Sequence, residues 1–122
     1  MSSKTITIIQ WVLAGLVAFI FIGSAVSKLT ANSEALEQVA KFGLTPTTYQ
    51  WLGIIEIISV ALFLNPRTGV LGSLLLIAYM GGAISTHVEF AQPLMAPIAI
   101  SAFLWIVAVI RFPELSKRLL NK

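Results

Sequence analysis

This chain of 122 residues is 57% apolar and 11% charged, contains neither aspartate nor cysteine, and carries a formal net charge of +3. Such a composition leaves no room for a water-soluble domain beside the apolar stretches, so we expect a membrane protein. The basic residues do not gather in one stripe, which argues against nucleic-acid binding. The absence of cysteine excludes disulfide relay, thiolate catalysis and iron–sulfur ligation by this chain alone.

Four apolar stretches account for most of the sequence. The segments 6–29, 46–64, 66–90 and 94–112 are each long enough to cross a hydrocarbon core of roughly 30 Å at about 1.5 Å per residue. We therefore predict an all-α polytopic bundle of four transmembrane helices that forms a single domain over residues 1–122. The first span lacks a small-x-small cleavage pattern and ends near a lysine, so we expect it to be retained rather than removed as a signal peptide.

Two short amphipathic segments accompany the spans. Asn32 or Ser33 can cap a helix over 33–42, and Gly43 suits the position just past its end. A second helix over 114–121 carries leucines a turn apart among basic residues. We expect both helices to lie at the membrane surface.

Prolines mark the starts of two spans. Thr45-Pro46 has the form of an N-cap followed by proline at the first helical position, and Asn65-Pro66 repeats it before the third span. The second and third spans are thus predicted to form a tight hairpin.

The charges in the loops predict the orientation. The side that holds both termini carries more basic residues than the other, which places both termini in the cytoplasm of a bacterial cell and the protein in its inner membrane. The basic residues on that side are Lys4, Arg67, Arg111, Lys117, Arg118 and Lys122, against Lys28 and Lys41 on the other.

Small residues at spacings of four predict close helix packing. Ala78, Gly82 and Thr86 follow this spacing in the third span, where Gly69 and Gly72 also lie nearer its start, and Gly23 and Ser27 follow it in the first. We interpret both stripes as packing seams rather than as sites of chemistry.

Glu56 is the most informative single residue, because a carboxylate within hydrocarbon must be neutral, paired or functional. Counted along the helices, Glu56, Tyr79 and Ser101 all fall about 10 Å below the outer interface and can share one polar layer. Lys28 can bend toward this layer or extend to the headgroups. Either Glu56 fixes helix packing through Lys28, Tyr79 or Ser101, or it binds a ligand or transfers protons.

Two further residues complete the candidate site. His87 is either a plain interfacial histidine or the best proton donor and acceptor of the chain, and Trp105 lies deep enough to line a pocket. The candidate catalytic residues are Glu56 and His87. The candidate ligand-binding residues are Lys28, Glu56, Tyr79, His87, Ser101 and Trp105.

No metal site or cofactor motif is identifiable in the sequence, although a quinone is compatible with the candidate residues. A haem would need axial ligands, and the chain offers a single histidine with Met80 and Met95 at unmatched depths.

Four motifs together resemble the DoxX-like family of small four-helix membrane proteins, over nearly the whole chain. They are Gly23-Ser24-Ala25-Val26-Ser27-Lys28-Leu29, Phe42-Gly43-Leu44 with Pro46, Gly53-Ile54-Ile55-Glu56, and Gly81-Gly82-Ala83-Ile84-Ser85-Thr86-His87. The resemblance implies mainly the architecture, with Lys28, Glu56 and His87 as the polar centre. Relatives are similar to a subunit of an archaeal thiosulfate:quinone oxidoreductase, to membrane proteins of redox-stress complexes and to eukaryotic receptor-assembly chaperones.

Three hypotheses on function follow, in order of preference. The first is a membrane accessory protein that binds a quinone or lipid in a polar-centred pocket open to the outer leaflet. The second is an assembly factor or structural partner that uses its helix faces to hold another membrane protein, with the polar layer serving only its own fold. The possible partners are thus another membrane protein or, in a homo-oligomer, further copies of this chain. The third is a small acid/base enzyme that uses Glu56 and His87.

Overall fold

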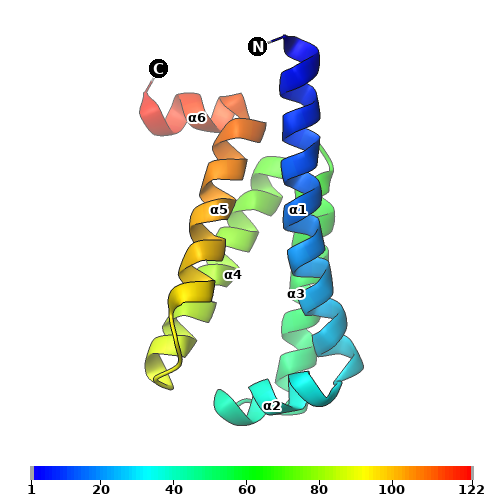
Figure 1. The fold of residues 1–122 in the computed structure, drawn as a ribbon, viewed down its shortest axis with the longest axis vertical. Coiled ribbons are helices and arrows are strands. Elements are labelled where there is room, and N and C mark those ends of the chain that lie inside the picture. The colour runs from blue at the N-terminus through cyan, green and yellow to red at the C-terminus, as the bar shows by residue number, and fades with distance from the viewer. Residues whose placement is uncertain (1, 122) are drawn as a thin grey trace.

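A computed structural model describes residues 2–121, and within this range the chain forms six helices and no strand. Four long helices run along the long axis of the molecule, and two short ones lie across its ends (Figure 1). The helices are α1 (Ser3–Thr30), α2 (Ser33–Lys41), α3 (Pro46–Leu64), α4 (Gly69–Glu89), α5 (Met95–Arg111) and α6 (Pro113–Leu120). The predicted all-α bundle is confirmed.

Length and composition allow three helices to cross a membrane, namely α1, α3 and α4. The fourth long helix, α5, has 17 residues and would extend over roughly 26 Å at 1.5 Å per residue, close to the thickness of a hydrocarbon core. It is followed directly by α6, which turns away from it by 105°. The molecule is therefore a polytopic membrane bundle of three or, with α5, four candidate spans.

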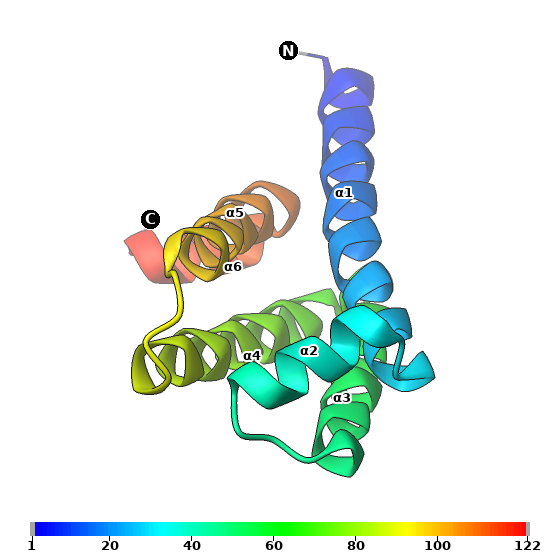
Figure 2. The same cartoon turned by 60° about the horizontal axis from the view of Figure 1, so that its bottom comes forward.

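Both ends of the chain lie at one end of the bundle, and α2 lies across the other (Figure 1). Figure 2, with that second end turned forward, shows α2 crossing in front of α3 and of the middle of α4, with the yellow-green end of α4 to one side. We call the end of the bundle with both termini the terminal end, and the opposite end the α2 end.

The predicted helix signals at the α2 end are confirmed. Asn32 caps α2 by accepting a hydrogen bond from the backbone N–H of Ala35, at 2.8 Å. Gly43, just past α2, has a φ of +63°, which glycine adopts without strain. Thr45 caps α3 by accepting from the N–H of Thr48.

The expected start of the third span at residue 66 is wrong. Asn65 instead ends α3, and its side chain accepts from the N–H of Arg67 within a turn, so that α4 begins at Gly69. Thr45 and Asn65 both precede proline and both have extended backbone, but the carbonyl oxygen of Asn65 accepts from the N–H of Thr68 at 3.1 Å, which closes a turn before α4 begins.

The core lies between α1, α3, α4 and α5, and glycines let the helices approach one another. A Cβ atom at Gly72 on α4 would collide with the backbone of Phe63 on α3. A Cβ atom at Gly53 on α3 would lie 3.1 Å from the carbonyl oxygen of Ala25 on α1. The buried apolar residues are Ala14, Val17, Ala18, Phe21, Val60, Phe63, Leu76, Met80, Leu104, Val107 and Phe112.

The two small-residue stripes expected as packing seams do not act as seams. A Cβ atom at Gly23 or at Gly82 would meet nothing within 4 Å. Ala78, Gly82 and Thr86 line a cavity instead of contacting another helix closely. Small residues permit close packing only where a second helix lies opposite, and none does at this part of α4.

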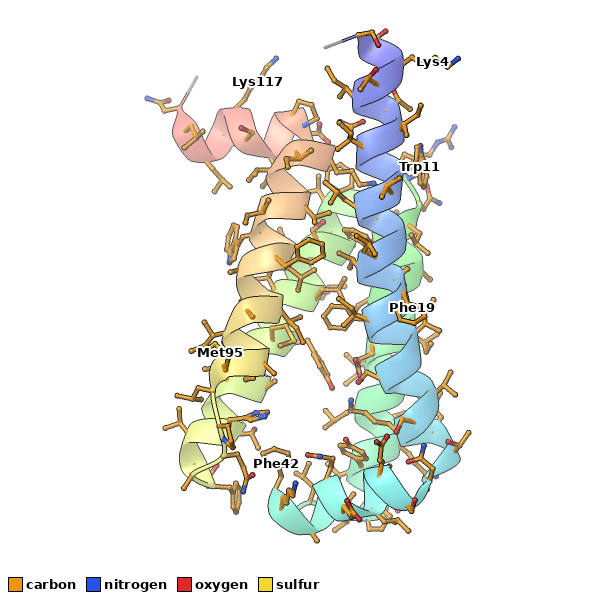
Figure 3. The ribbon with its side chains drawn as sticks, in the orientation of Figure 1. Lys4, Trp11, Phe19, Phe42, Met95 and Lys117 are labelled. Atoms are coloured by element: carbon orange, nitrogen blue, oxygen red, sulfur yellow. The ribbon has the colours of Figure 1, made fainter. Side chains whose placement is uncertain are left out.

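The outer surface of the bundle is apolar, as lipid contact requires. Phe19 and Met95 are 80% and 81% exposed, and many leucines and isoleucines around the helices are also exposed. Figure 3 shows Phe19 and Met95 along the length of the bundle, between Lys4 and Lys117 at the terminal end and Phe42 at the α2 end. An apolar surface of this extent belongs in a bilayer rather than in water.

Candidate functional site

A buried ion pair joins α1 and α3 in the half of the bundle nearer α2. The ammonium of Lys28 lies 2.7 Å from Oε1 of Glu56, and the two side chains are only 10% and 1% exposed. Gly53, one turn before Glu56 on α3, allows this approach because it packs against Ala25 and the Cβ of Lys28. The lysine therefore bends into the bundle rather than extending to the headgroups.

Two hydroxyls complete the cluster around the pair. Ser24, one turn before Lys28 on α1, accepts a hydrogen bond from the ammonium and donates one to Glu56 Oε1 at 3.2 Å. Tyr79 on α4 donates to the same oxygen at 3.1 Å. These extra hydrogen bonds matter because a buried ion pair offsets its desolvation only when its remaining polar atoms are also bonded.

The two carboxylate oxygens of Glu56 differ sharply. All the donors reach Oε1, and Oε2 has no hydrogen-bond partner within residues 2–121. Among these residues, no side-chain oxygen or nitrogen is both fully buried and without a partner. Oε2 must therefore border open space, and the open space beside Glu56 is a cavity.

Two cavities flank this cluster. The larger, of about 600 Å³, lies among α2, α3 and α4 and the lysine of α1. The smaller, of about 220 Å³, lies among α1, α3, α4 and α5. Lys28, Tyr79, Ala83 and His87 line both, so these side chains form the partition between them, whereas Glu56 lines only the smaller.

The smaller cavity lies on the less tightly closed side of the bundle. Helices α1 and α5 contact each other much less than α1 contacts α3 or α3 contacts α4. Its walls, apart from the polar cluster, are Ile20, Phe21, Met80, Ala83, Ala96, Pro97 and Ile100.

His87 lies at the end of α4 nearest α2. Its Nδ1 is 2.6 Å from the carbonyl oxygen of Ala83, which can only accept, so Nδ1 carries a hydrogen. In the neutral ring, Nε2 is then an acceptor. Phe42, just after α2, packs on the ring with centroids 4.7 Å apart, and together they close the α2 end of the larger cavity.

Tyr49 is a member of the site that the sequence analysis missed. The ammonium of Lys28 lies 5.1 Å from the centroid of its ring and 5.9 Å from that of Tyr79. Tyr49 precedes Glu56 by seven residues on α3, and this spacing of two helical turns is a signal that could have found it. Gln38 and Thr48, also missed, line the larger cavity with it.

Two expected residues do not join the cluster. Ser101 and Trp105 line neither cavity, and Trp105 is 40% exposed on the outside of α5. The polar layer around Glu56 thus consists of Ser24, Lys28 and Tyr79, and Ser101 is not part of it. Ser101 has the right depth, but α5 is rotated so that Pro97, Ile100 and Leu104 face the bundle instead.

A second buried cation lies near the terminal end. Arg111 of α5 donates hydrogen bonds to the carbonyl oxygens of Phe63 and Leu64, the last two residues of α3. Trp11, Phe63 and Phe112 surround its guanidinium, with centroids 4.7 to 5.0 Å away. Arg111 is therefore buried within the bundle and is not the loop charge at the membrane surface that the charge asymmetry of the sequence predicts.

No group of three histidine, cysteine, aspartate or glutamate side chains within residues 2–121 could hold a metal ion. Comparison with curated proteins gave no match, and neither did comparison with solved structures.

A model of the DoxX-like family matches residues 12–110, a range that contains Lys28, Glu56, Tyr79, His87 and most of each long helix. The match covers far more than half of the 122 residues and confirms the family indicated by the four motifs. The chain belongs to the DoxX-like family.

Proposed function

We propose that this DoxX-like protein is a membrane accessory protein that binds a lipophilic molecule, of quinone or lipid type, in the cavities around Lys28 and Glu56. The observation that carries the proposal is Glu56 Oε2, a carboxylate oxygen without a partner in residues 2–121 that borders a cavity within an apolar bundle. A carboxylate in such a place costs less if a bound molecule supplies a donor.

The size and lining of the cavities support a small-molecule ligand. The larger cavity, of about 600 Å³, lies within the range of ligand pockets in proteins, and the smaller, of about 220 Å³, has room only for a small group. Apolar walls with a few polar groups are typical of such pockets. The residues proposed to contact the ligand are Lys28, Glu56, Tyr79 and His87, which line one or both cavities. Ser101 and Trp105, outside both, are not proposed as contacts.

The proposal includes an orientation, in which both termini are cytoplasmic and the cavities lie in the outer half of the membrane. Lys28 and Arg111 are buried, so neither counts as a loop charge. The terminal end still carries more exposed basic residues than the α2 end, as the positive-inside rule requires. They are Lys4, Arg67, Lys117 and Arg118, with Lys122 outside the described residues, against Lys41.

Labelling tests this orientation. Ser33→Cys at the start of α2 should react with a membrane-impermeant maleimide in intact cells, and Ser116→Cys in α6 should react only after lysis. Labelling of Ser116→Cys in intact cells would reject a cytoplasmic C-terminal segment.

Native mass spectrometry of the purified protein tests the ligand. We expect a co-purifying hydrophobe whose amount falls in Gly82→Leu, because Gly82 lines the larger cavity and a leucine there would occupy part of it. Gly23→Leu is the matched control, since its Cβ also meets open space but the residue lines neither cavity. A wild-type protein free of hydrophobe that also takes up none from added lipid or quinone would contradict the proposal.

One observation favours acid/base catalysis as a second candidate. Glu56 and His87 both line the smaller cavity, so one molecule there could exchange a proton with each. Turnover of a bound molecule by the wild-type protein, lost in His87→Gln while binding persists, would distinguish catalysis from binding alone.

A further inference from the structure

The polar groups around the smaller cavity can be counted as donors and acceptors, and the donors are already used. The hydroxyls of Ser24 and Tyr79 both donate to Glu56 Oε1. The Lys28 ammonium donates to Oε1 and to Ser24, and its remaining side faces the rings of Tyr49 and Tyr79 at 5.1 and 5.9 Å. A hydroxyl has one hydrogen and an ammonium three, so little donor capacity is left for a ligand.

The groups left over are acceptors. Glu56, 1% exposed, has the free oxygen Oε2 beside this cavity. His87 lines the same cavity, and because its Nδ1 hydrogen is directed at Ala83, the neutral ring offers Nε2 as an acceptor. A ligand that presents a hydrogen to this cavity would therefore be bound through a charge-assisted hydrogen bond, whereas one that presents only a carbonyl or ether oxygen would find no free donor.

The charges of Lys28 and Glu56 also limit which net charge the head group of a ligand can carry. A cationic head would lie beside the Lys28 ammonium, which lines the same cavity, and an anionic head would lie beside the free oxygen of Glu56. Lys28 and Glu56 already neutralise each other, so a charged head would leave water without a counter-ion of its own and lose its solvation. A neutral head satisfies both neighbours.

We infer that the smaller cavity recognises a neutral hydroxyl group, carried on a compact apolar body, by hydrogen bonding to Glu56 Oε2. The body packs against Ile20, Phe21, Met80 and Ile100, and the volume of about 220 Å³ restricts it to a ring or short chain. This inference rests on the proposed function and narrows it for this cavity: a quinone presents only carbonyl oxygens and would not be held by Oε2, whereas its reduced, hydroxyl-bearing form would.

A matched pair of probes tests the inference on the unaltered protein. Para-butylanisole carries a methyl group in place of the hydroxyl hydrogen of para-butylphenol, so it is slightly larger and cannot donate; the Glu56→Gln comparison below separates hydrogen bonding from the difference in size. We expect the phenol to bind roughly ten- to hundredfold more tightly in detergent, as the loss of a hydrogen bond to a charged group implies. Isothermal titration calorimetry, with the titration into empty micelles subtracted, gives the two dissociation constants.

The outcomes separate the head group from the proposed function. Equal binding of both probes, or tighter binding of the ether, would overturn the hydroxyl inference and leave lipophile binding supported. Binding of neither probe, together with no co-purifying hydrophobe, would overturn both.

Glu56→Gln provides a second test, because it replaces the free carboxylate oxygen by an NH₂ group. The amide oxygen would take the position of Oε1, where Lys28, Ser24 and Tyr79 donate, and the NH₂ group would replace the free Oε2. The free acceptor becomes a donor, so the preference for the phenol should disappear or reverse. Ser101→Ala, a loss of a hydroxyl outside both cavities, should keep the full preference; a Glu56→Gln protein that also keeps it would overturn the inference.

Discussion

The two buried cations of this protein, Arg111 near the terminal end and Lys28 toward the α2 end, are held in opposite ways. Arg111 donates to two carbonyl oxygens at the end of α3 and is enclosed by aromatic rings. Lys28 is paired with a carboxylate beside two cavities. Backbone carbonyls at a helix end need a donor in any state of the protein, so Arg111 is a structural cap. A carboxylate with a free oxygen can still take another partner, so the Lys28 region suits a binding site.

The glycines also differ between the two ends of the bundle. Gly72 lies where α4 touches the backbone of α3, and Gly69 lies against the ring of Phe112. Gly82, toward the α2 end, borders a cavity instead. Tight packing at one end holds the helices together, which allows them to separate around open space at the other.

The largest expected effect is that of Lys28→Ala, which removes the only charge paired with Glu56 in residues 2–121. Breaking one side of a buried pair should lower the free energy of unfolding by roughly 3–5 kcal/mol. A double-mutant cycle with Lys28→Met and Glu56→Gln, measured by unfolding in detergent, gives the coupling between the two residues. A coupling under about 0.5 kcal/mol would show that they act independently.

The loss of stability on replacing Glu56 should depend on whether the new side chain still accepts hydrogen bonds from the donors around it. Glu56→Leu removes the acceptor of Lys28, Ser24 and Tyr79 and should cost roughly 2–4 kcal/mol, less than a full broken pair because the lysine can extend toward water. Glu56→Gln keeps an oxygen for them and should cost roughly 1–2 kcal/mol. Equal melting temperatures of the two variants would mean that the carboxylate makes no polar contact of importance.

Replacing each of two glycines of α4 by alanine compares the stability of the packed part of the bundle with that of the part beside the cavity. Gly72→Ala should destabilise the protein by roughly 1–3 kcal/mol, because its Cβ would collide with the backbone of Phe63. Gly82→Ala meets nothing within 4 Å and should be neutral or stabilising by up to about 1 kcal/mol through helix propensity. Thermal unfolding in the same detergent compares them, and a Gly82→Ala protein as unstable as Gly72→Ala would contradict the difference.

Arg111→Lys should cost about 1–2 kcal/mol, as little as Glu56→Gln, because lysine keeps the charge but loses the fork that reaches both carbonyls and the aromatic contacts. Ligand binding should be unchanged, since Arg111 lines neither cavity. Arg118→Lys, exposed on α6, is the control and should leave stability unaltered. Loss of ligand from Arg111→Lys at a temperature where the protein stays folded would show that the two regions are coupled.

Much of the fold could be predicted from the sequence because its signals are local. Apolar length indicates a span, and Asn32, Gly43 and Thr45 each mark a helix boundary through their own backbone or side chain. The Asn65-Pro66 prediction failed because that pair can form either an N-cap or a turn, and the choice depends on how α3 and α4 pack.

The candidate site was predicted less completely. Lys28, Glu56 and Tyr79 were correctly expected to share a polar layer, since depth in the membrane follows from counting residues along each helix. Ser101 lies at the depth of Glu56 in the membrane, but its side chain does not face the cavity beside Glu56. In a helix with apolar residues on all sides, hydrophobic periodicity does not fix which face turns inward.

What the sequence determined by itself is therefore the class of the protein, its family, the number and rough limits of its helices, and the need for a partner to Glu56. The family follows from four motifs along the chain, and the others depend on composition and on neighbours within one helix. Only the tertiary structure decided that Arg111 caps α3, that the stripe with Gly82 borders a cavity, and that one oxygen of Glu56 takes every donor while the other stays free. These features depend on the rotation and spacing of four helices packed together, which no single segment encodes.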